Sequence, residues 1–226
     1  MEPMELALAC DRAAFERVRQ TLRCGMTEQE LFGEIQQAFQ AQAGKPVPCQ
    51  YDLVSGPRAG AIGGPATEKV IQQGECVITD LLPQVDGTWC DTTRTFFLGE
   101  PGEELRRAYA ALLVALRRGE ACLRPGVTGD AVFQAVDQCL REQGYPGLAH
   151  HAGHAVGPAP LVEPDFVAGC QTPIQEGMVV TLEPGLYFEN NGMRIENNYR
   201  ITAQGAENIL RYPEEIEYFI IQEDTL

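Results

Sequence analysis

The sequence predicts an α+β fold built from two similar halves, each a helix pair followed by a β-hairpin, around a central antiparallel sheet. Three observations support this prediction. The chain has 226 residues, 44% of them hydrophobic, so it can bury a full core. Two segments with helical periodicity precede two strand-like runs, and the same order of elements occurs again further along the chain. Cap residues and strand-end residues fall at matching places in both copies.

The first half should begin with two helices, at residues 4–23 and 27–43. The second helix opens with a capping box, in which Thr27 and Glu30 satisfy each other's backbone amides, and it ends at Gly44. Its apolar residues recur at helical spacing and predict one buried stripe, made of Leu31, Phe32, Ile35 and Phe39.

A second helix pair is expected at residues 103–123 and 128–143, with Gly144 after its end. The two pairs align at a constant offset, which indicates an internal duplication. The matched positions are Gly25 with Gly126, Thr27 with Thr128, Phe32 with Phe133, Gln37 with Gln138, and Gln42 with Gln143.

Each helix pair is followed by a Gly-rich loop and then by a hairpin. The first strands, residues 74–80 and 177–183, both end in an acid, and the returning strands, 89–97 and 193–201, each contain one acid in an otherwise strand-like run. Each half therefore supplies two carboxylates. The four acids are Asp80, Asp91, Glu183 and Glu196.

These four acids predict a dinuclear metal site. Aspartate is disfavoured in strands, and buried acids are almost always paired or bound to metal. A pseudo-twofold relation between the hairpins would bring the four together, where charges about 4 Å apart repel by about 4 kcal/mol per pair at an effective dielectric near 20. Two divalent cations balance four negative charges, and at least one carboxylate is expected to bridge them.

All three histidines of the chain, His150, His151 and His154, lie within residues 149–157, beside two glycines. A solvated His-rich turn is the alternative interpretation, and it would be preferred if the acids were absent. Together with the acids, an imidazole ligand favours Mn, Fe, Co or Zn over Ca or Mg.

The composition excludes several classes of function. With 32 acidic and 17 basic residues the chain carries a formal charge of −15, which repels nucleic acid and anionic membranes. The N-terminal segment is interrupted by charges and does not resemble a signal peptide, and no segment approaches the roughly 20 apolar residues that cross a bilayer. We therefore expect a soluble, cytoplasmic protein whose eight cysteines are reduced and mostly buried thiols rather than a zinc-ribbon or disulfide framework.

Five runs of the chain resemble, in order, the motifs of the pita-bread metallopeptidases, which include methionine aminopeptidases, Xaa-Pro dipeptidases and aminopeptidase P. The Xaa-Pro branch is matched best. The resemblance covers nearly the whole chain and implies the pita-bread (creatinase/aminopeptidase-like) fold. The runs are residues 77–80, 89–96, 150–157, 180–187 and 194–197.

The resemblance implies two divalent ions, manganese, cobalt, iron or zinc, and five ligands. By this comparison Asp80 is a terminal ligand, Asp91 and Glu196 bridge the two ions, His154 binds one of them, and Glu183 is the fifth ligand.

The resemblance also implies catalytic and substrate-binding roles. Glu183 would act as proton shuttle, and His150 and Arg194 would line the substrate site. His150 and Arg194 are also expected to be catalytic, since either could help to stabilise the developing oxyanion or a substrate carboxylate. The expected activity is dinuclear metal-dependent hydrolysis of a peptide or amide bond in a short peptide or small amide substrate. The alternatives are a binding module that keeps its metal but has little or no activity, and a metal-free hydrolase of the creatinase kind.

The chain departs from the family at two positions. Gly63 stands where the Xaa-Pro enzymes carry a histidine after a Ser-Gly, and Leu161 replaces another histidine seven residues after His154. Both departures predict weaker activity on standard Xaa-Pro dipeptides.

The domain organisation expected from the resemblance is a single catalytic domain, residues 1–226, with pseudo-repeats at about 1–100 and 101–210 and no separate N-terminal domain. The resemblance also favours a homodimer. The acidic segment 213–221 fits either an edge strand or a solvated extension.

Overall fold

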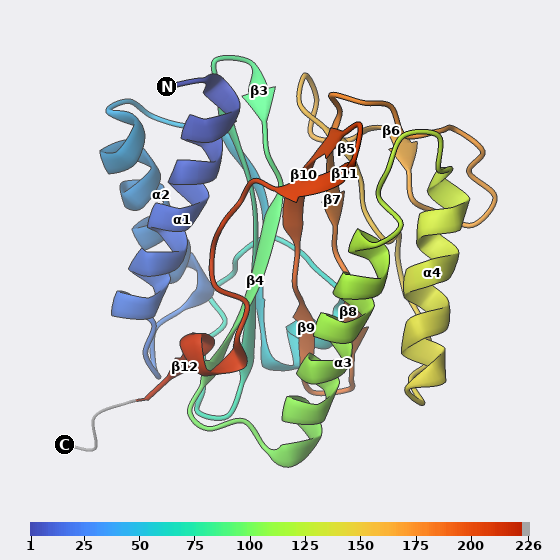
Figure 1. Cartoon of the computed structure of the whole chain (residues 1–226). Helices are drawn as coiled ribbons and strands as arrows, with labels where there is room; N and C mark the ends of the chain where they lie inside the picture. The colour runs from blue at the N-terminus through green and yellow to red at the C-terminus, as the bar shows by residue number, and fades with distance from the viewer. Residues whose placement is uncertain (223–226) are drawn as a thin grey trace.

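The structure is a computed structural model, and it describes residues 1–222. In the first half of the chain, a pair of helices packs against a sheet (Figure 1). The sheet has the order β1-β2-β4-β12, and β3 pairs with β2. Neighbouring strands are antiparallel except for β12, which is parallel to β4. The elements are α1 (Pro3–Thr21), α2 (Glu28–Ala43), β1 (Cys49–Ser55), the 3-10 helix η1 (Gly56–Ala61), β2 (Cys76–Val85), β3 (Thr88–Trp89), β4 (Thr92–Leu98) and β12 (Ile220–Ile221).

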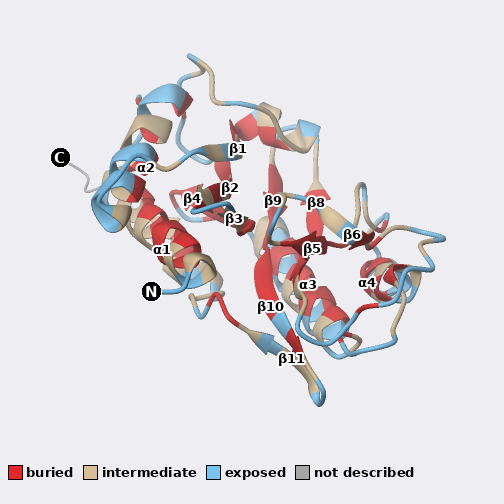
Figure 2. Cartoon of the chain, turned by 90° about the horizontal axis from the view of Figure 1, so that it is seen from above, coloured by how far each residue is buried: buried red, intermediate tan, exposed pale blue. Residues whose placement is uncertain are grey.

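The second half repeats this plan with shorter strands. Its sheet has the order β11-β10-β7-β5-β6, and a separate pair, β8-β9, lies beside it. Figures 1 and 2 place the strands between the two helix pairs, and the buried residues gather on the strands and on the helix sides that face them. The elements are α3 (Glu103–Glu120), α4 (Gly129–Glu142), β5 (His154–Val156), β6 (Val162–Asp165), β7 (Val179–Leu182), β8 (Gly185–Tyr187), β9 (Gly192–Arg194), β10 (Asn197–Thr202), β11 (Gly205–Asn208) and the 3-10 helix η2 (Ile216–Phe219).

The four predicted helices are all present, with ends that differ by at most a few residues from the prediction. The capping box is confirmed: Thr27 accepts a hydrogen bond from the amide of Glu30, and the Glu30 side chain accepts one from the amide of Thr27. Gly44 ends α2 in the left-handed conformation that favours glycine. Strand β1 was not predicted, because the alternation of its residues is obscured by Cys49, Gln50 and Asp52.

Strand β4 joins the two halves. All of its residues are buried, including Arg94, whose guanidinium donates to the backbone oxygen and side chain of residues in the second half. The backbone amide of Glu196 donates to the Thr93 oxygen at 3.1 Å, and the amide of Arg194 donates to Thr95 Oγ1 at 2.9 Å. The predicted central sheet is therefore divided into two sheets that meet along β4, and this seam fixes the position of the acids.

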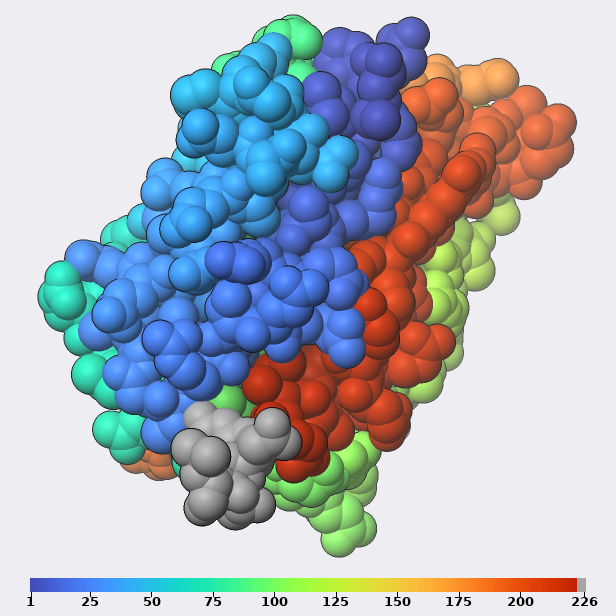
Figure 3. Space-filling view, turned by 90° about the vertical axis from the view of Figure 1, so that its left-hand side faces the viewer, coloured from blue at the N-terminus to red at the C-terminus, as the bar shows by residue number. Residues whose placement is uncertain are grey.

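The C-terminal segment returns to the first half. Figure 3 shows it running along the face of the molecule beside α1. The hydroxyl groups of Tyr212 and Tyr218 donate to Glu16 on α1, and Phe219 is buried. Of the two interpretations of residues 213–221, the edge strand is correct for the two residues of β12, which pair with the end of β4.

Two remaining expectations concern cysteines and membranes. Four of the eight cysteines are buried, namely Cys10, Cys76, Cys90 and Cys139. The prediction that most of them are buried is therefore correct for half of the set. Within residues 1–222, no helix is long and apolar enough to cross a membrane.

Candidate metal centre

The predicted ligands lie on or beside strands that meet near the seam. Asp80 is in the middle of β2, whereas Asp91 directly precedes β4 and Glu196 directly precedes β10. Glu183 directly follows β7, and the last residue of β7 pairs with the first residue of β10. Because Glu196 directly precedes β10, Glu183 and Glu196 lie at adjacent ends of two neighbouring strands. Asp80 pairs across the sheet with Thr93, whose hydroxyl donates to Glu196 at 3.0 Å. The duplicated hairpins thus bring all four acids together.

His154, the first residue of β5, completes the group. Its Nε2 lies 3.2 Å from Asp91 Oδ2 and 3.7 Å from Glu183 Oε1. Its Nδ1 lies 3.0 Å from the backbone oxygen of Ala155. Donation of the Nδ1 proton to that carbonyl leaves the lone pair of Nε2 directed toward the acids, as in a metal-ligating histidine. Donor atoms of Asp91, His154 and Glu196 all lie within 4.8 Å of one another.

Unpartnered oxygens show that these residues fit a cation. Asp80 Oδ1, Asp91 Oδ1 and Glu196 Oε1 are buried and accept no hydrogen bond from any residue in the described part of the chain. Buried polar atoms are nearly always satisfied, and each one left unpaired costs about 1–3 kcal/mol. Three such oxygens from three neighbouring carboxylates, together with an imidazole, form a donor set suited to divalent transition metals.

The electrostatics of the acids differ. Burial raises the pKa values of Asp91 and Glu196 well above the usual range, and the charges of the neighbouring carboxylates raise them further. Burial also acts to raise the pKa of Glu183, but the hydrogen bond and charge of His151 and the charges of the other histidines outweigh it and lower the value to about 2. Without a cation, Asp91 and Glu196 therefore favour protonation, whereas Glu183 stays ionised.

Arg194 and His150, predicted to line the substrate site, lie beside the acids. Arg194 is buried and donates to Asp80 Oδ2 at 2.5 Å, to the Tyr187 hydroxyl at 2.9 Å and to Thr93 Oγ1 at 3.0 Å. It thereby fixes one oxygen of Asp80 and leaves the other free for a cation.

Both ring nitrogens of His150 are engaged. Nε2 lies 2.7 Å from the Tyr187 hydroxyl, and Nδ1 lies 2.8 Å from the backbone oxygen of His151. Burial lowers the pKa of His150 to about 4, so the ring is neutral at pH 7. The substrate-binding roles of His150 and Arg194 stay predictions.

The two positions that lack a histidine have different surroundings. A Cβ atom on Gly63 would lie 2.0 Å from Asp52 Oδ2, so the carboxylate of Asp52 occupies the space that a side chain there would enter. Asp52 pairs with Asp80 across β1 and β2, and its Oδ2 lies 3.6 Å from Arg194 Nη2. Leu161 lies in the loop between β5 and β6 and is 50% exposed. A carboxylate, rather than an imidazole, thus faces Arg194 on this side.

Sequence reasoning assigned no role to His151 or to its partner Asp165. His151 Nδ1 lies 2.9 Å from Asp165 Oδ1, and its Nε2 lies 3.1 Å from Glu183 Oε1. The clustering of three histidines was the available signal for His151. Asp52 was missed because its strand was missed.

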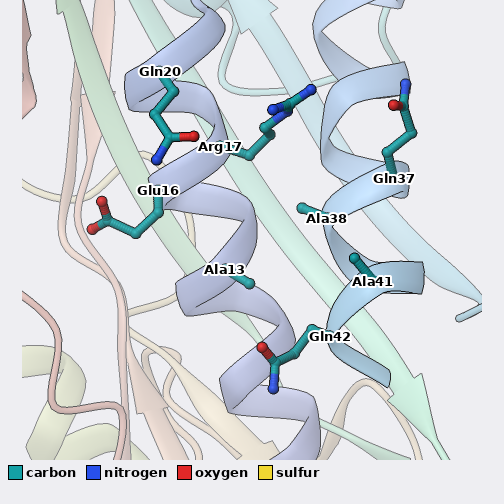
Figure 4. Close-up of a pocket in the computed structure, with 8 residues that line it drawn as sticks. All are labelled: Ala13, Glu16, Arg17, Gln20, Gln37, Ala38, Ala41 and Gln42. Carbon is teal, nitrogen blue, oxygen red and sulfur yellow. The ribbon is translucent and has the colours of Figure 1, made fainter. Parts of the chain in front are cut away.

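A surface groove lies away from this centre, between α1 and α2, with a volume of about 550 Å³. Figure 4 shows Ala13 of α1 and Ala38 and Ala41 of α2 pointing into the space between the helices. None of the described residues that line it belongs to the acid cluster.

Comparison with known families agrees with this geometry. Residues 2–203 match Metallopeptidase family M24. The chain belongs to this family. Among the relatives of this M24 chain, the Xaa-Pro dipeptidase of Pyrococcus furiosus is 29% identical over 214 residues, which are 94% of this chain and 60% of the relative. The probable dipeptidase PepE of Mycobacterium tuberculosis is 31% identical over 208 residues, which are 88% of this chain and 54% of the relative.

Solved structures confirm the pita-bread α+β fold of this M24 chain. The X-Pro aminopeptidase from Thermotoga maritima superimposes with a TM-score of 0.92 at 28% identity and covers 97% of this chain and 62% of its own. Dipeptidase PepE from Mycobacterium ulcerans gives a TM-score of 0.91 at 30% identity, and the match covers 97% of this chain and 59% of the PepE chain. The chain spans between half and two thirds of the length of the relatives that it matches.

Proposed function

We propose that this chain hydrolyses a peptide or amide bond at a two-metal centre held by Asp80, Asp91, His154, Glu183 and Glu196. One observation carries the proposal: buried oxygens of Asp80, Asp91 and Glu196 accept no hydrogen bond from the described residues, and donor atoms of Asp91 and Glu196 lie within 4.8 Å of His154. A protein that only bound a partner through this fold would gain nothing from holding four acids together, since their mutual repulsion opposes folding. The family membership supports the same function.

The residues of the centre have different roles in the proposed reaction. Two divalent cations bound here would supply a water of lowered pKa and a polarised substrate carbonyl. Glu183, buried and ionised, can accept a proton and deliver it to the leaving nitrogen. Arg194 holds Asp80 in place through a charge-assisted hydrogen bond. His150 is neutral, and its bond to the Tyr187 hydroxyl orients that hydroxyl beside Arg194.

We infer a short peptide with a residue before proline, or a small amide, as substrate. The support comes from relatives named as an Xaa-Pro dipeptidase and an X-Pro aminopeptidase. Two missing imidazoles, at Gly63 and Leu161, are each expected to weaken stabilisation of the transition state by about 1.5–3 kcal/mol. Turnover of standard Xaa-Pro dipeptides should therefore be slower by about a hundredfold or more than in an enzyme with both histidines.

The experiment is a screen of the Mn- or Co-loaded protein against Xaa-Pro dipeptides, peptides with an N-terminal methionine and small amides, with Glu183→Gln as the control for contaminating peptidases. Hydrolysis that this variant lacks supports the proposal. Metal uptake without hydrolysis of any substrate in the panel would instead favour a metal-retaining binding protein. An Xaa-Pro rate equal to that of enzymes with both histidines would show that the departures at Gly63 and Leu161 are harmless.

A further inference from the structure

His151 lies at the edge of the centre, and the structure supports a role for it. We propose that His151 is a sixth metal ligand, so that one ion is bound by two imidazoles, those of His151 and His154. This inference rests on the proposed two-metal function. The histidine side of the centre is the part formed by His151, His154 and Glu183. The side chains that bind an ion there influence which metals the centre prefers.

The distances fit shared coordination of a single ion. His151 Nε2 lies 3.1 Å from Glu183 Oε1, and His154 Nε2 lies 3.7 Å from the same oxygen. Two atoms that each bind one ion at about 2.0–2.2 Å are separated by about 4.4 Å at most, and by about 3 Å in neighbouring positions. Glu183 Oε1 therefore lies within this range of both imidazole nitrogens.

Glu183 Oε1 is within reach of both imidazoles. His151 Nε2 lies 3.1 Å from this buried oxygen, and the contact acts as a hydrogen bond on the Glu183 carboxylate. An ion bound by both atoms would take the place of that hydrogen bond, since each atom would then direct a lone pair to the ion. The rings of His151 and His154 lie close together, with centroids 5.2 Å apart.

Asp165 prepares His151 for this role. The Nδ1 of His151 lies 2.9 Å from Asp165 Oδ1, and the pairing of β5 with β6 places Asp165 directly opposite His154. A carboxylate that accepts the Nδ1 proton fixes the tautomer and directs the Nε2 lone pair to the other side, the arrangement found around metal-ligating histidines. His151 thus has a carboxylate behind it, where His154 has the carbonyl of Ala155.

His150 does not share this role. Donor atoms of His150, His151 and Glu183 lie within 4.8 Å of one another, which raises the possibility of an independent third site. Both nitrogens of His150 are already engaged, however, one with the Tyr187 hydroxyl and one with the His151 backbone oxygen. The donors of this group that remain for an ion are therefore His151 Nε2 and Glu183 Oε1, and Glu183 Oε1 also lies 3.7 Å from His154 Nε2.

A second imidazole has a chemical consequence. Carboxylate-rich sites suit Mn and Mg, whereas imidazole nitrogens favour Zn, Co, Fe and Ni. The ion on the histidine side is therefore expected to be one of the latter group. The ion on the Asp80 side, surrounded by carboxylates, has no such preference.

The test counts imidazole ligands by X-ray absorption of the protein loaded with two cobalt ions per chain. Six ligands predict an average of one imidazole per cobalt in the wild-type protein, because two histidines are shared by two ions. His151→Ala should halve this average, and His151→Gln serves as a second variant if the first does not fold. The matched control is His150→Ala, which leaves the average unchanged because neither nitrogen of that ring is free.

The outcomes separate this inference from the proposed function. A wild-type protein that binds two cobalt ions with an average of half an imidazole each would show that His151 only donates a hydrogen bond to Glu183, and would overturn the inference while leaving the function intact. Failure to bind cobalt at all would overturn both. The zinc affinity of His151→Ala gives an independent measure, with a drop of about 10- to 100-fold expected.

Discussion

The two halves of the molecule supply corresponding acids, Asp80 and Glu183, to the same centre but surround them differently. Asp80 is held by the guanidinium of Arg194 and faces other carboxylates. Glu183 lies among three histidines, and their charges and hydrogen bonds hold its pKa at about 2 against the effect of burial. Duplication of a hairpin therefore explains where the acids lie, whereas their chemical difference comes from residues that were not duplicated.

This difference assigns unequal tasks to the two halves. The first half offers a fixed carboxylate, since Arg194 takes one oxygen of Asp80. The second half offers an ionised acid that can exchange protons, as a proton shuttle requires. Substitutions in each half can therefore separate the two tasks.

Replacement of the shuttle should have the largest effect. Glu183→Gln is expected to lower kcat by about 10²- to 10⁴-fold, because the amide cannot carry the proton. The steady-state rate on the best substrate of the panel measures this. Near-normal kcat in a metal-loaded Glu183→Gln protein would show that another group moves the proton.

Removal of the metals should destabilise the protein strongly at neutral pH. Each site occupied at a thousand times its Kd contributes about 4 kcal/mol to the free energy of unfolding. A melting curve with and without chelator measures the loss. An unchanged Tm at neutral pH would contradict the clustering of the acids.

The metal-free protein should then become more stable as the pH falls from about 8 to about 6.5. The folded-state pKa values of Asp91 and Glu196 are raised, so their favourable contribution is complete below the ordinary carboxyl pKa and is lost as the pH rises through the folded values. His151, whose pKa is raised to about 9 because Glu183 and Asp165 outweigh burial, acts in the same direction. The contribution of Glu183, whose pKa is lowered, persists above its ordinary pKa and does not oppose the trend. His150, whose pKa burial lowers to about 4, opposes the trend only below about pH 6.5, where the unfolded chain begins to protonate this residue. A fall in apo Tm over this interval would contradict the assignment.

Loss of the Arg194 guanidinium should lower the free energy of unfolding by less than loss of the metals. Arg194→Ala leaves Asp80 partly buried without its partner and should lower the free energy of unfolding by about 3–5 kcal/mol. Urea unfolding measures this, and Arg211→Ala is the control, because its ion pair with Glu207 is exposed. Equal stabilities of the two variants would show that Arg194 does not support Asp80.

The smallest expected difference lies in the helix caps of the two halves. Thr27 takes part in a reciprocal capping box, whereas the Thr128 side chain accepts a hydrogen bond from the amide of Ala131, whose methyl group cannot reciprocate. Thr27→Ala should destabilise by about 1 kcal/mol or slightly more, and Thr128→Ala by less. Chemical denaturation of both variants compares them directly. A larger loss for Thr128→Ala would show that the cap hydrogen bonds do not determine the ranking.

The sequence allowed the helices and the acids to be predicted because both depend on local signals. The capping box at Thr27 and the acids placed within strand-like runs are visible without knowledge of any distant contact. The fold followed from their repetition. The same reasoning placed Asp80, Asp91, Glu183 and Glu196 together, as the structure does.

Features that depend on contacts between distant segments were not visible in the sequence. Strand β1 is recognised only by its pairing with β2, and Asp52 faces Arg194 only because of that pairing. The role of Arg94 across the seam likewise depends on residues from the other half. His151 was visible as a member of a cluster, but its orientation depends on Asp165, which approaches through the pairing of β6.

Metal content after reconstitution decides whether the four acids and His154 form a two-metal centre. Elemental analysis measures it for the purified wild type, Asp91→Ala and Glu196→Ala. We predict about two transition-metal ions per wild-type chain and clearly fewer in both variants, since each variant removes a carboxylate expected to bridge the ions. Full occupancy in both variants, or no metal in the reconstituted wild type, would show that these residues do not form the centre.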